Sequence, residues 1–147
     1  MSEEKKPPEY KLILNPADGS EASARATQHA IYLAKLTGAE LLILHVVETN
    51  FAWYTGALYQ QVVDQLRDFG NKVLEQSMGM AKHEGVEARS MMMDGHSGTV
   101  IVRIAEREKA DIIVMGAVGR SMVEEALMGS ISRHVVRNAP CPVLVVK

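Results

Sequence analysis

The sequence predicts an α/β fold in which a parallel sheet carries helices on both of its faces. Short apolar runs alternate along the chain with longer segments in which apolar residues recur at three- and four-residue steps. The short runs are typical of strands buried on both faces, and the longer segments are typical of amphipathic helices. Their alternation gives the order βαβαβαβαβ, which favours an open, twisted, five-stranded parallel sheet with right-handed crossovers.

Five segments are expected to form the strands of this sheet. Four are bounded by polar or turn residues, and the weaker fifth contains three consecutive methionines, which we interpret as flexible core filler. The final segment is short and apolar, and we expect it at an edge of the sheet, where free backbone groups are a template for pairing. The five are Lys11–Leu14, Leu41–Val47, Val86–Asp94, Ile112–Met115 and Val143–Val146.

Helices are expected in the gaps between the strands. The first spans Ser20–Leu36, where Ser20 is placed to cap the start and Gly38 to end the helix. The other three are marked by apolar residues at helical spacing. These are Tyr59 to Ala81, stopped by Gly85; Val100 to Ala105; and Ile131 to Val136, which ends before Pro140.

Length and composition indicate one soluble domain. The chain has 147 residues, 47% of them hydrophobic, with a net charge of −2, so we expect a flexible tail over residues 1–9 and a single domain over 10–147. It has neither the clustered basic stripe of a nucleic-acid-binding protein nor the run of about 20 apolar residues of a membrane span. Without a signal peptide at the start, a cytoplasmic location is expected.

A glycine-rich segment follows the fourth predicted strand directly. Gly116 and Gly119 are separated by two residues, and nine more lead to Gly129 and Ser130 at the start of the last predicted helix. Glycines let a backbone approach a ligand closely, and the first N–H groups of a helix suit phosphate, so the segment predicts a phosphate-binding loop. The alternative is that these glycines only form turns around a short helix, Met122 to Leu127.

Other known phosphate loops are excluded. The sequence has no Gly-Lys-Ser/Thr and no two glycines spaced two apart, so it has neither a Walker A motif nor GxGxxG. The five histidines show no metal-ligand spacing, and we assign no metal site and no catalytic residue. The single cysteine, Cys141, is interpreted as structural because no base or helix N-terminus is evident beside it.

Ligands of such sheets bind beyond the carboxyl ends of the strands, so the loops after strands one, two and four are the expected site. Asp18 lies in the first of these loops and could accept hydrogen bonds from a ribose hydroxyl or an adenine amine; alternatively it is a local capping group. Arg120 could reach a terminal phosphate or be solvated. His45 is expected to pack rather than bind ligand. Trp53 and Tyr54 could close over a base or lie at an oligomer interface.

This layout resembles the universal stress protein family, whose nucleotide-binding members carry G-x2-G-x9-G-S/T. The resemblance implies a Rossmann-like sheet of the adenine nucleotide alpha hydrolase type, with the strand order 3-2-1-4-5. It covers nearly the whole domain and is carried by Lys11-Leu12-Ile13-Leu14, Asp18-Gly19-Ser20-Glu21, Leu44-His45-Val46-Val47, Asp111-Ile112-Ile113-Val114-Met115-Gly116 and Pro142-Val143-Leu144-Val145-Val146.

The resemblance also implies a ligand and its binding residues. The ligand would be ATP, with Mg²⁺ or Mn²⁺ at its phosphates. By similarity, one group of residues would surround the adenine and ribose, and a second group would line the ribose and phosphates. The first group is Pro16, Asp18 and Val46, and the second is Met115, Gly116, Gly119, Gly129, Ser130 and Ile131.

The chain departs from the family pattern at two places. Ala117-Val118 stands where many relatives have Ser-His, and Ser97 stands where many have proline. The first change removes polar side chains but leaves the backbone donors, so we expect binding to survive with altered affinity.

Three functions remain open at this stage. The first is an ATP-binding signalling or stress-response module that dimerises through its last strand, as the resemblance implies. The second is slow ATP hydrolysis or autophosphorylation at Ser121 or Ser130, for which no catalytic base is identified. The third is a dimeric interaction protein that binds no nucleotide, although the intact glycine motif speaks against it.

Overall fold

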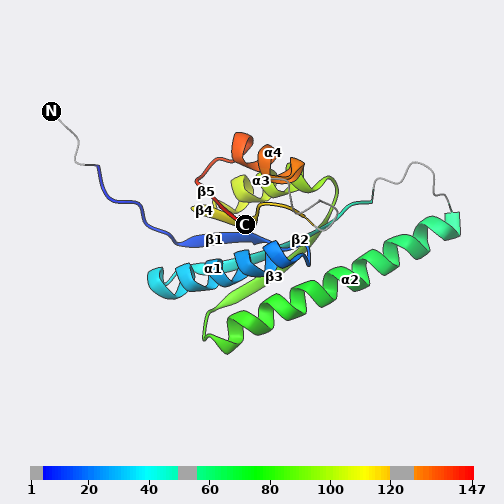
Figure 1. Ribbon diagram of the computed structural model, residues 1–147, viewed down its shortest axis with the longest axis horizontal. Helices are drawn as coiled ribbons and strands as arrows, with labels where there is room; N and C mark the ends of the chain where they lie inside the picture. Colours follow the sequence, from blue (N-terminus) through cyan, green and yellow to red (C-terminus); the bar gives the residue numbers. More distant parts are fainter. Residues whose placement is uncertain (1–4, 50–55, 120–127) are drawn as a thin grey trace.

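The computed structural model describes residues 5–49, 56–119 and 128–147. Its centre is a five-stranded parallel sheet in the order β3-β2-β1-β4-β5. Helices α1 and α2 cover one face and helices α3 and α4 cover the other (Figure 1). The predicted fold class and strand order are therefore confirmed, and the winding direction reverses between β1 and β4.

The strands lie close to their predicted positions. β1 differs most, because it continues two residues past the predicted end through Asn15 and Pro16, which pair with β2. β5 is at the edge of the sheet, and it is half-buried rather than buried on both faces as expected. The strands are β1 (Leu12–Pro16), β2 (Glu40–Val47), β3 (Ala88–Asp94), β4 (Ile112–Gly116) and β5 (Val143–Val146).

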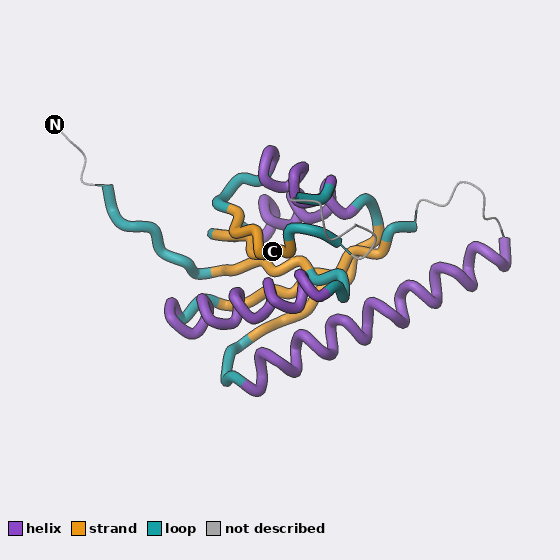
Figure 2. The backbone as a smooth tube through the Cα atoms, in the orientation of Figure 1, coloured by secondary structure: helices purple, strands orange, loops and turns teal. Residues whose placement is uncertain are grey.

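The helices follow the predicted order, and α1 has the predicted ends. The Ser20 hydroxyl accepts a hydrogen bond from the Ser23 N–H at 3.0 Å, and Gly38 closes the helix with a φ of 73°. Figure 2 shows the longest helix, α2, running past the end of the sheet. The helices are α1 (Glu21–Thr37), α2 (Gly56–His83), α3 (Ser97–Glu108) and α4 (Ser130–Asn138).

The core has two parts, one on each face of the sheet. Side chains alternate between the faces along each strand, so Ile13 and Ile43 pack beneath α1 and α2, whereas Leu14 and Leu42 pack beneath α3 and α4. All four are fully buried. The central strands are thus held from both sides, and their carboxyl ends are fixed relative to one another.

The first described residues, 5–9, lie outside this core. Residues 5–10 have no regular secondary structure, and residues 5–9 are exposed. Within the described ranges, no helix is both long and apolar enough to cross a membrane.

Candidate functional site

A cleft opens where β1 and β4 separate at their carboxyl ends. β1 pairs with β2 as far as Pro16, but its pairing with β4 ends at Leu14. The buried Asn15 side chain fills the gap between the separating strands, and its amide donates to the Val114 carbonyl at 2.9 Å. The reversal of the sheet therefore creates space at this edge without leaving that carbonyl unpaired.

The cleft has an empty volume of about 690 Å³, which includes space open to solvent. Its walls come from the ends of β1, β2 and β4, the loops after β1 and β4, and the starts of α1, α3 and α4. The described lining residues are Pro16, Ala17, Asp18, Ser20, Ser23, Leu44, Val46, Ser97, Ile101, Met115, Gly116, Ala117, Val118, Gly119, Gly129, Ser130, Ile131 and Ser132.

The loop after β1 presents Asp18 to the cleft. One carboxylate oxygen, Oδ1, accepts a hydrogen bond from the Ser20 N–H at 2.9 Å, and the Asp18 N–H donates to the Ser23 hydroxyl at 3.0 Å. Asp18 is therefore a local capping group, as one interpretation of the sequence held, and it also lines the cleft. The two interpretations are compatible because Oδ1 and Oδ2 can accept separate hydrogen bonds.

The glycine loop contacts Asp18 at one side of the cleft. A Cβ atom placed on Gly119 would lie 3.0 Å from Asp18 Oδ2, closer than ordinary van der Waals contact. Glycine at 119 therefore lets the loop after β4 come against the loop after β1. Segments about 100 residues apart in the sequence form one wall.

Gly116 has a different reason to be glycine. A Cβ atom on it would lie 2.9 Å from the backbone nitrogen of Ser23 and 3.0 Å from the carbonyl carbon of Ala22. The end of β4 thus packs directly on the first turn of α1. The sequence predicts this glycine as a point of close approach to a ligand, but its close backbone contact is with α1, although it also lines the cleft.

The start of α4 supplies backbone donors. Gly129 is the N-cap residue and has no side chain with which to cap the helix; the first intrahelical bond runs from the Arg133 N–H to the Gly129 carbonyl at 3.1 Å. The N–H groups of Ser130, Ile131 and Ser132 precede that bond, so they are suited to an acceptor from outside the helix. A helix N-terminus of this kind favours anions.

Ser132 holds this end of α4 to the glycine loop, a role that the sequence interpretation missed. Its buried hydroxyl donates to the Ala117 carbonyl at 2.7 Å and also lies 3.0 Å from the Gly129 carbonyl oxygen, while the Gly129 N–H donates to Ala117 at 2.7 Å. Serine in the first turn of a helix commonly bonds nearby backbone groups, so its position was the available signal. The loop after β4 is thus anchored at Ala117.

The start of α3 forms the opposite wall. The Ser97 N–H donates to the Glu48 carboxylate at 3.2 Å, a hydrogen bond that a proline at position 97 could not make because it lacks the N–H. The anion-attracting end of α3 is thus occupied by a side chain of the protein itself. Nearby, Ile101, Val46 and Met115 give the cleft an apolar side.

Nine of the ten predicted binding residues line this one cleft, and the tenth, Arg120, lies outside the described residues. The alternative short helix over residues 122–127, around which the glycines would form turns, also lies outside them, as do Ser121, Trp53 and Tyr54. His45 does not line the cleft; it is buried, and its ring packs edge-on to Phe69. Within residues 5–49, 56–119 and 128–147, no group of three or more His, Cys, Asp or Glu residues is arranged to hold a metal ion.

Charge is sparse in the cleft. Asp18 is the one acidic or basic residue among its described lining residues, and the rest are glycines, serines and apolar residues. The polar chemistry therefore comes mainly from backbone N–H groups and hydroxyls. Such a site fits a ligand with an apolar ring, hydroxyl donors for a carboxylate and an anionic group for a helix N-terminus.

Comparison with known proteins finds relatives over nearly the whole chain. The model of the universal stress protein family matches residues 9–147. A universal stress protein of Methanocaldococcus jannaschii is 38% identical over 140 residues, covering 94% of this chain and 82% of the relative. The solved structure of universal stress protein UspA from Lactobacillus plantarum has a TM-score of 0.87 at 27% identity, covering 95% of this chain and 99% of that one.

A second similar structure was solved with a bound ligand. It is a universal stress protein in complex with cAMP, with a TM-score of 0.72 at 28% identity, covering 94% of this chain and 97% of the other. Both the family match and the identity to the curated relative extend over nearly the whole chain. The chain belongs to the universal stress protein family.

Proposed function

We propose that the cleft binds an adenine nucleotide, namely ATP, and that the protein acts as a nucleotide-dependent signalling or stress-response module. The observation that carries the proposal is the meeting of three features in one cleft: the Asp18 carboxylate, the glycine loop at Gly119 and the open N-terminus of α4. The structure of a relative with cAMP supports the adenine nucleotide class.

The chemistry of the walls orients the ligand. The adenine ring would lie along the apolar side formed by Val46, Met115 and Pro16, with the ribose hydroxyls donating to Asp18. The phosphates would accept hydrogen bonds from the backbone of Gly119 and from the N–H groups of Ser130 and Ile131. Arg120 follows Gly119 directly and would add a positive charge at a terminal phosphate.

A divalent cation fits this site only together with the nucleotide. Magnesium is commonly bound by one or two carboxylates plus substrate phosphates, but Asp18, the one carboxylate among the described lining residues, is assigned to the ribose. Mg²⁺ or Mn²⁺ would therefore be held mainly by the phosphates and would neutralise part of their charge.

Calorimetric titration with ATP and Mg²⁺ tests the proposal when Gly119→Ala is compared with Gly79→Ala. The new Cβ at position 119 would press on Asp18 Oδ2, whereas a Cβ at Gly79, on the exposed side of α2, would have nothing within 4 Å. Displacing the carboxylate weakens a hydrogen bond, so we expect a Kd about fivefold higher for Gly119→Ala. Gly79→Ala should bind like the unaltered protein. Equal affinities in all three would contradict the placement of the ligand against Gly119.

We also propose that the protein is a homodimer joined at β5. This strand is at the edge of the sheet, and Leu144 on it and Val136 on the adjacent α4 are 37% and 47% exposed. The Pro142 and Val146 carbonyls accept hydrogen bonds from β4, so alternate residues such as Val145 direct their backbone groups toward the free edge. That edge is a pairing template for the same strand of a second copy.

Proline at position 145 tests this arrangement. Val145→Pro removes an N–H that points away from β4, so the fold should persist while pairing between copies is lost. Light scattering at micromolar concentration should give the mass of a dimer for the unaltered protein and of a monomer for Val145→Pro. A dimer that survives this change would place the contact elsewhere.

A further inference from the structure

We propose that His45 is a positioning residue for the nucleotide site: its imidazole N–H fixes the peptide unit between Ala17 and Asp18 and thereby sets the direction of the Asp18 carboxylate. The expected effect of His45 on nucleotide affinity rests on the proposed function. His45 does not line the cleft, so it acts through Asp18.

The peptide between Ala17 and Asp18 is held on both sides. Its carbonyl lies 2.8 Å from His45 Nδ1, and its N–H donates to the Ser23 hydroxyl at 3.0 Å. Because a peptide unit is planar, these two hydrogen bonds fix its orientation. The preceding peptide is fixed as well, since the Ala17 N–H donates to the Leu44 carbonyl at 2.8 Å.

These contacts bind the loop after β1 to two consecutive residues of β2. The Ala17 N–H pairs with Leu44, and its carbonyl pairs with His45. Ala17 is 4% exposed, so its carbonyl would have little access to water if the imidazole were removed. A buried carbonyl without a donor is costly, and the peptide would rotate to find another partner.

The carboxylate of Asp18 depends on that peptide. Oδ1 accepts from the Ser20 N–H at 2.9 Å, and Oδ2 faces the backbone of Gly119. A rotated peptide would move the side chain that follows it, and the two glycine-containing loops would no longer meet in the same way. His45 therefore prepares the site before any ligand arrives.

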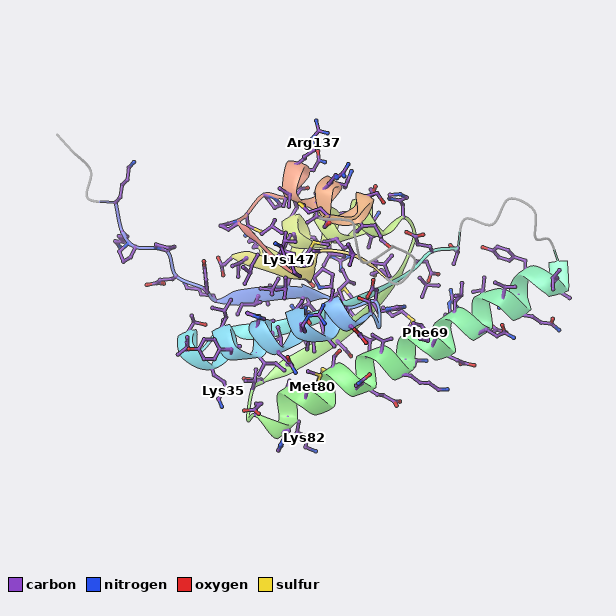
Figure 3. All side chains as sticks on the ribbon, in the orientation of Figure 1. Lys35, Phe69, Met80, Lys82, Arg137 and Lys147 are labelled. Atoms are coloured by element: carbon purple, nitrogen blue, oxygen red, sulfur yellow. The ribbon has the colours of Figure 1, made fainter. Side chains whose placement is uncertain are left out.

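Packing leaves the imidazole little room to move. His45 is 6% exposed, and its ring meets Phe69 edge-on with centroids 6.2 Å apart; Figure 3 labels Phe69 on α2. A Cβ on Gly70 would lie only 2.5 Å from His45 Cδ2, so the imidazole ring packs directly against α2 at a glycine. Phe69 also lies against Gly19, whose added Cβ would be 2.8 Å from the ring.

The hydrogen bond specifies one tautomer. A carbonyl oxygen only accepts, so Nδ1 must carry the proton in the bond to Ala17. This requirement can be measured without any nucleotide, by long-range ¹H–¹⁵N correlation spectra of the imidazole in the unaltered protein. A neutral ring with its proton on Nε2 would overturn the proposal.

Two substitutions separate positioning from packing. His45→Asn keeps an amide N–H near the place of Nδ1, whereas His45→Leu keeps apolar bulk and loses the donor. We expect ATP to bind His45→Leu about fivefold to tenfold more weakly than the unaltered protein, and His45→Asn within about twofold of it. Titrations are made well below the melting temperature of each variant.

Equal affinities of the two variants would assign His45 to packing alone and overturn the proposal. The exchange rate of the Asp18 amide hydrogen gives a second readout, which requires no ligand: we expect faster exchange in His45→Leu than in His45→Asn. If the unaltered protein binds no ATP, the proposed function fails, while the tautomer and the amide exchange still decide the role of His45. Exchange that is the same in both variants would contradict it.

Discussion

Replacing Asn15 with leucine should destabilise the protein by opening the polar network beneath the cleft. Asn15 is fully buried, donates to the Val114 carbonyl at 2.9 Å and accepts from the Thr27 hydroxyl at 2.8 Å. Leucine has a similar branched shape but has neither the donor for Val114 nor the acceptor for Thr27. The Val114 carbonyl loses this donor where β1 and β4 separate, whereas the Thr27 hydroxyl keeps its bond to the Ser23 carbonyl at 3.1 Å.

The expected cost follows from these contacts. A buried polar group left without a partner costs about 1–3 kcal/mol, so we expect the free energy of unfolding to fall by roughly 2 kcal/mol. For a chain of this size, that corresponds to a melting temperature lower by about 4–8 °C. Thermal unfolding followed by circular dichroism measures the shift.

A double-mutant cycle makes this test specific. Thr27→Val removes the hydroxyl that donates to Asn15, and the double variant removes both members of that hydrogen bond. The double variant should lose less stability than the sum of the single changes, because Thr27→Val alone leaves the buried Asn15 Oδ1 without its donor and the double variant no longer contains that acceptor. An Asn15→Leu variant as stable as the unaltered protein, or strictly additive losses, would refute the reasoning.

The remaining predictions concern backbone packing, one ion pair and the cysteine. Gly116→Ala should lower the free energy of unfolding by about 1–3 kcal/mol, because its Cβ would press on the backbone of α1, whereas Gly79→Ala should raise it by about 0.5–1 kcal/mol; urea unfolding compares them. The pKa of the Glu84 carboxyl is lowered mainly by its hydrogen bond with Lys35. The contribution of this ion pair to folding stability is therefore present above the ordinary glutamate pKa and is lost as the pH falls. In an NMR titration, Lys35→Met should raise the pKa of Glu84. Burial, and then the charge of Asp111, raise the pKa of the Cys141 thiol, so iodoacetamide should alkylate it more slowly at pH 7 than it alkylates a cysteine peptide. Unchanged stability, an unmoved pKa or equally fast alkylation would contradict the respective prediction.

Much of the fold could be predicted from local patterns. Apolar runs and helical spacing placed all nine elements in the correct order, and Ser20 and Gly38 marked the ends of α1 because capping depends on residues close in the sequence. The end of β1 was missed because Asn15 and Pro16 do not look like strand residues. They are held there by pairing with β2, which a single segment does not reveal.

The candidate site was predictable to the extent that it depends on backbone loops at the ends of strands. The glycine spacing and Asp18 identified residues that do line one cleft. The contacts that support the site were not predictable, because they join distant parts of the chain: Asn15 with Val114, and His45 with Ala17. Gly116 shows the same limit, since its spacing indicated a ligand and its close backbone contact is with α1.

The identity of the molecule carried by freshly purified protein tests the central claim most directly. The protein is denatured, the released small molecules are identified by chromatography and mass spectrometry, and the emptied, refolded protein is titrated with ATP and Mg²⁺ by calorimetry. We predict an adenine nucleotide, ATP, near one molecule per chain, and measurable rebinding. No released nucleotide and no binding heat at two temperatures would contradict the account and leave the surface of the protein as the place to look for its function.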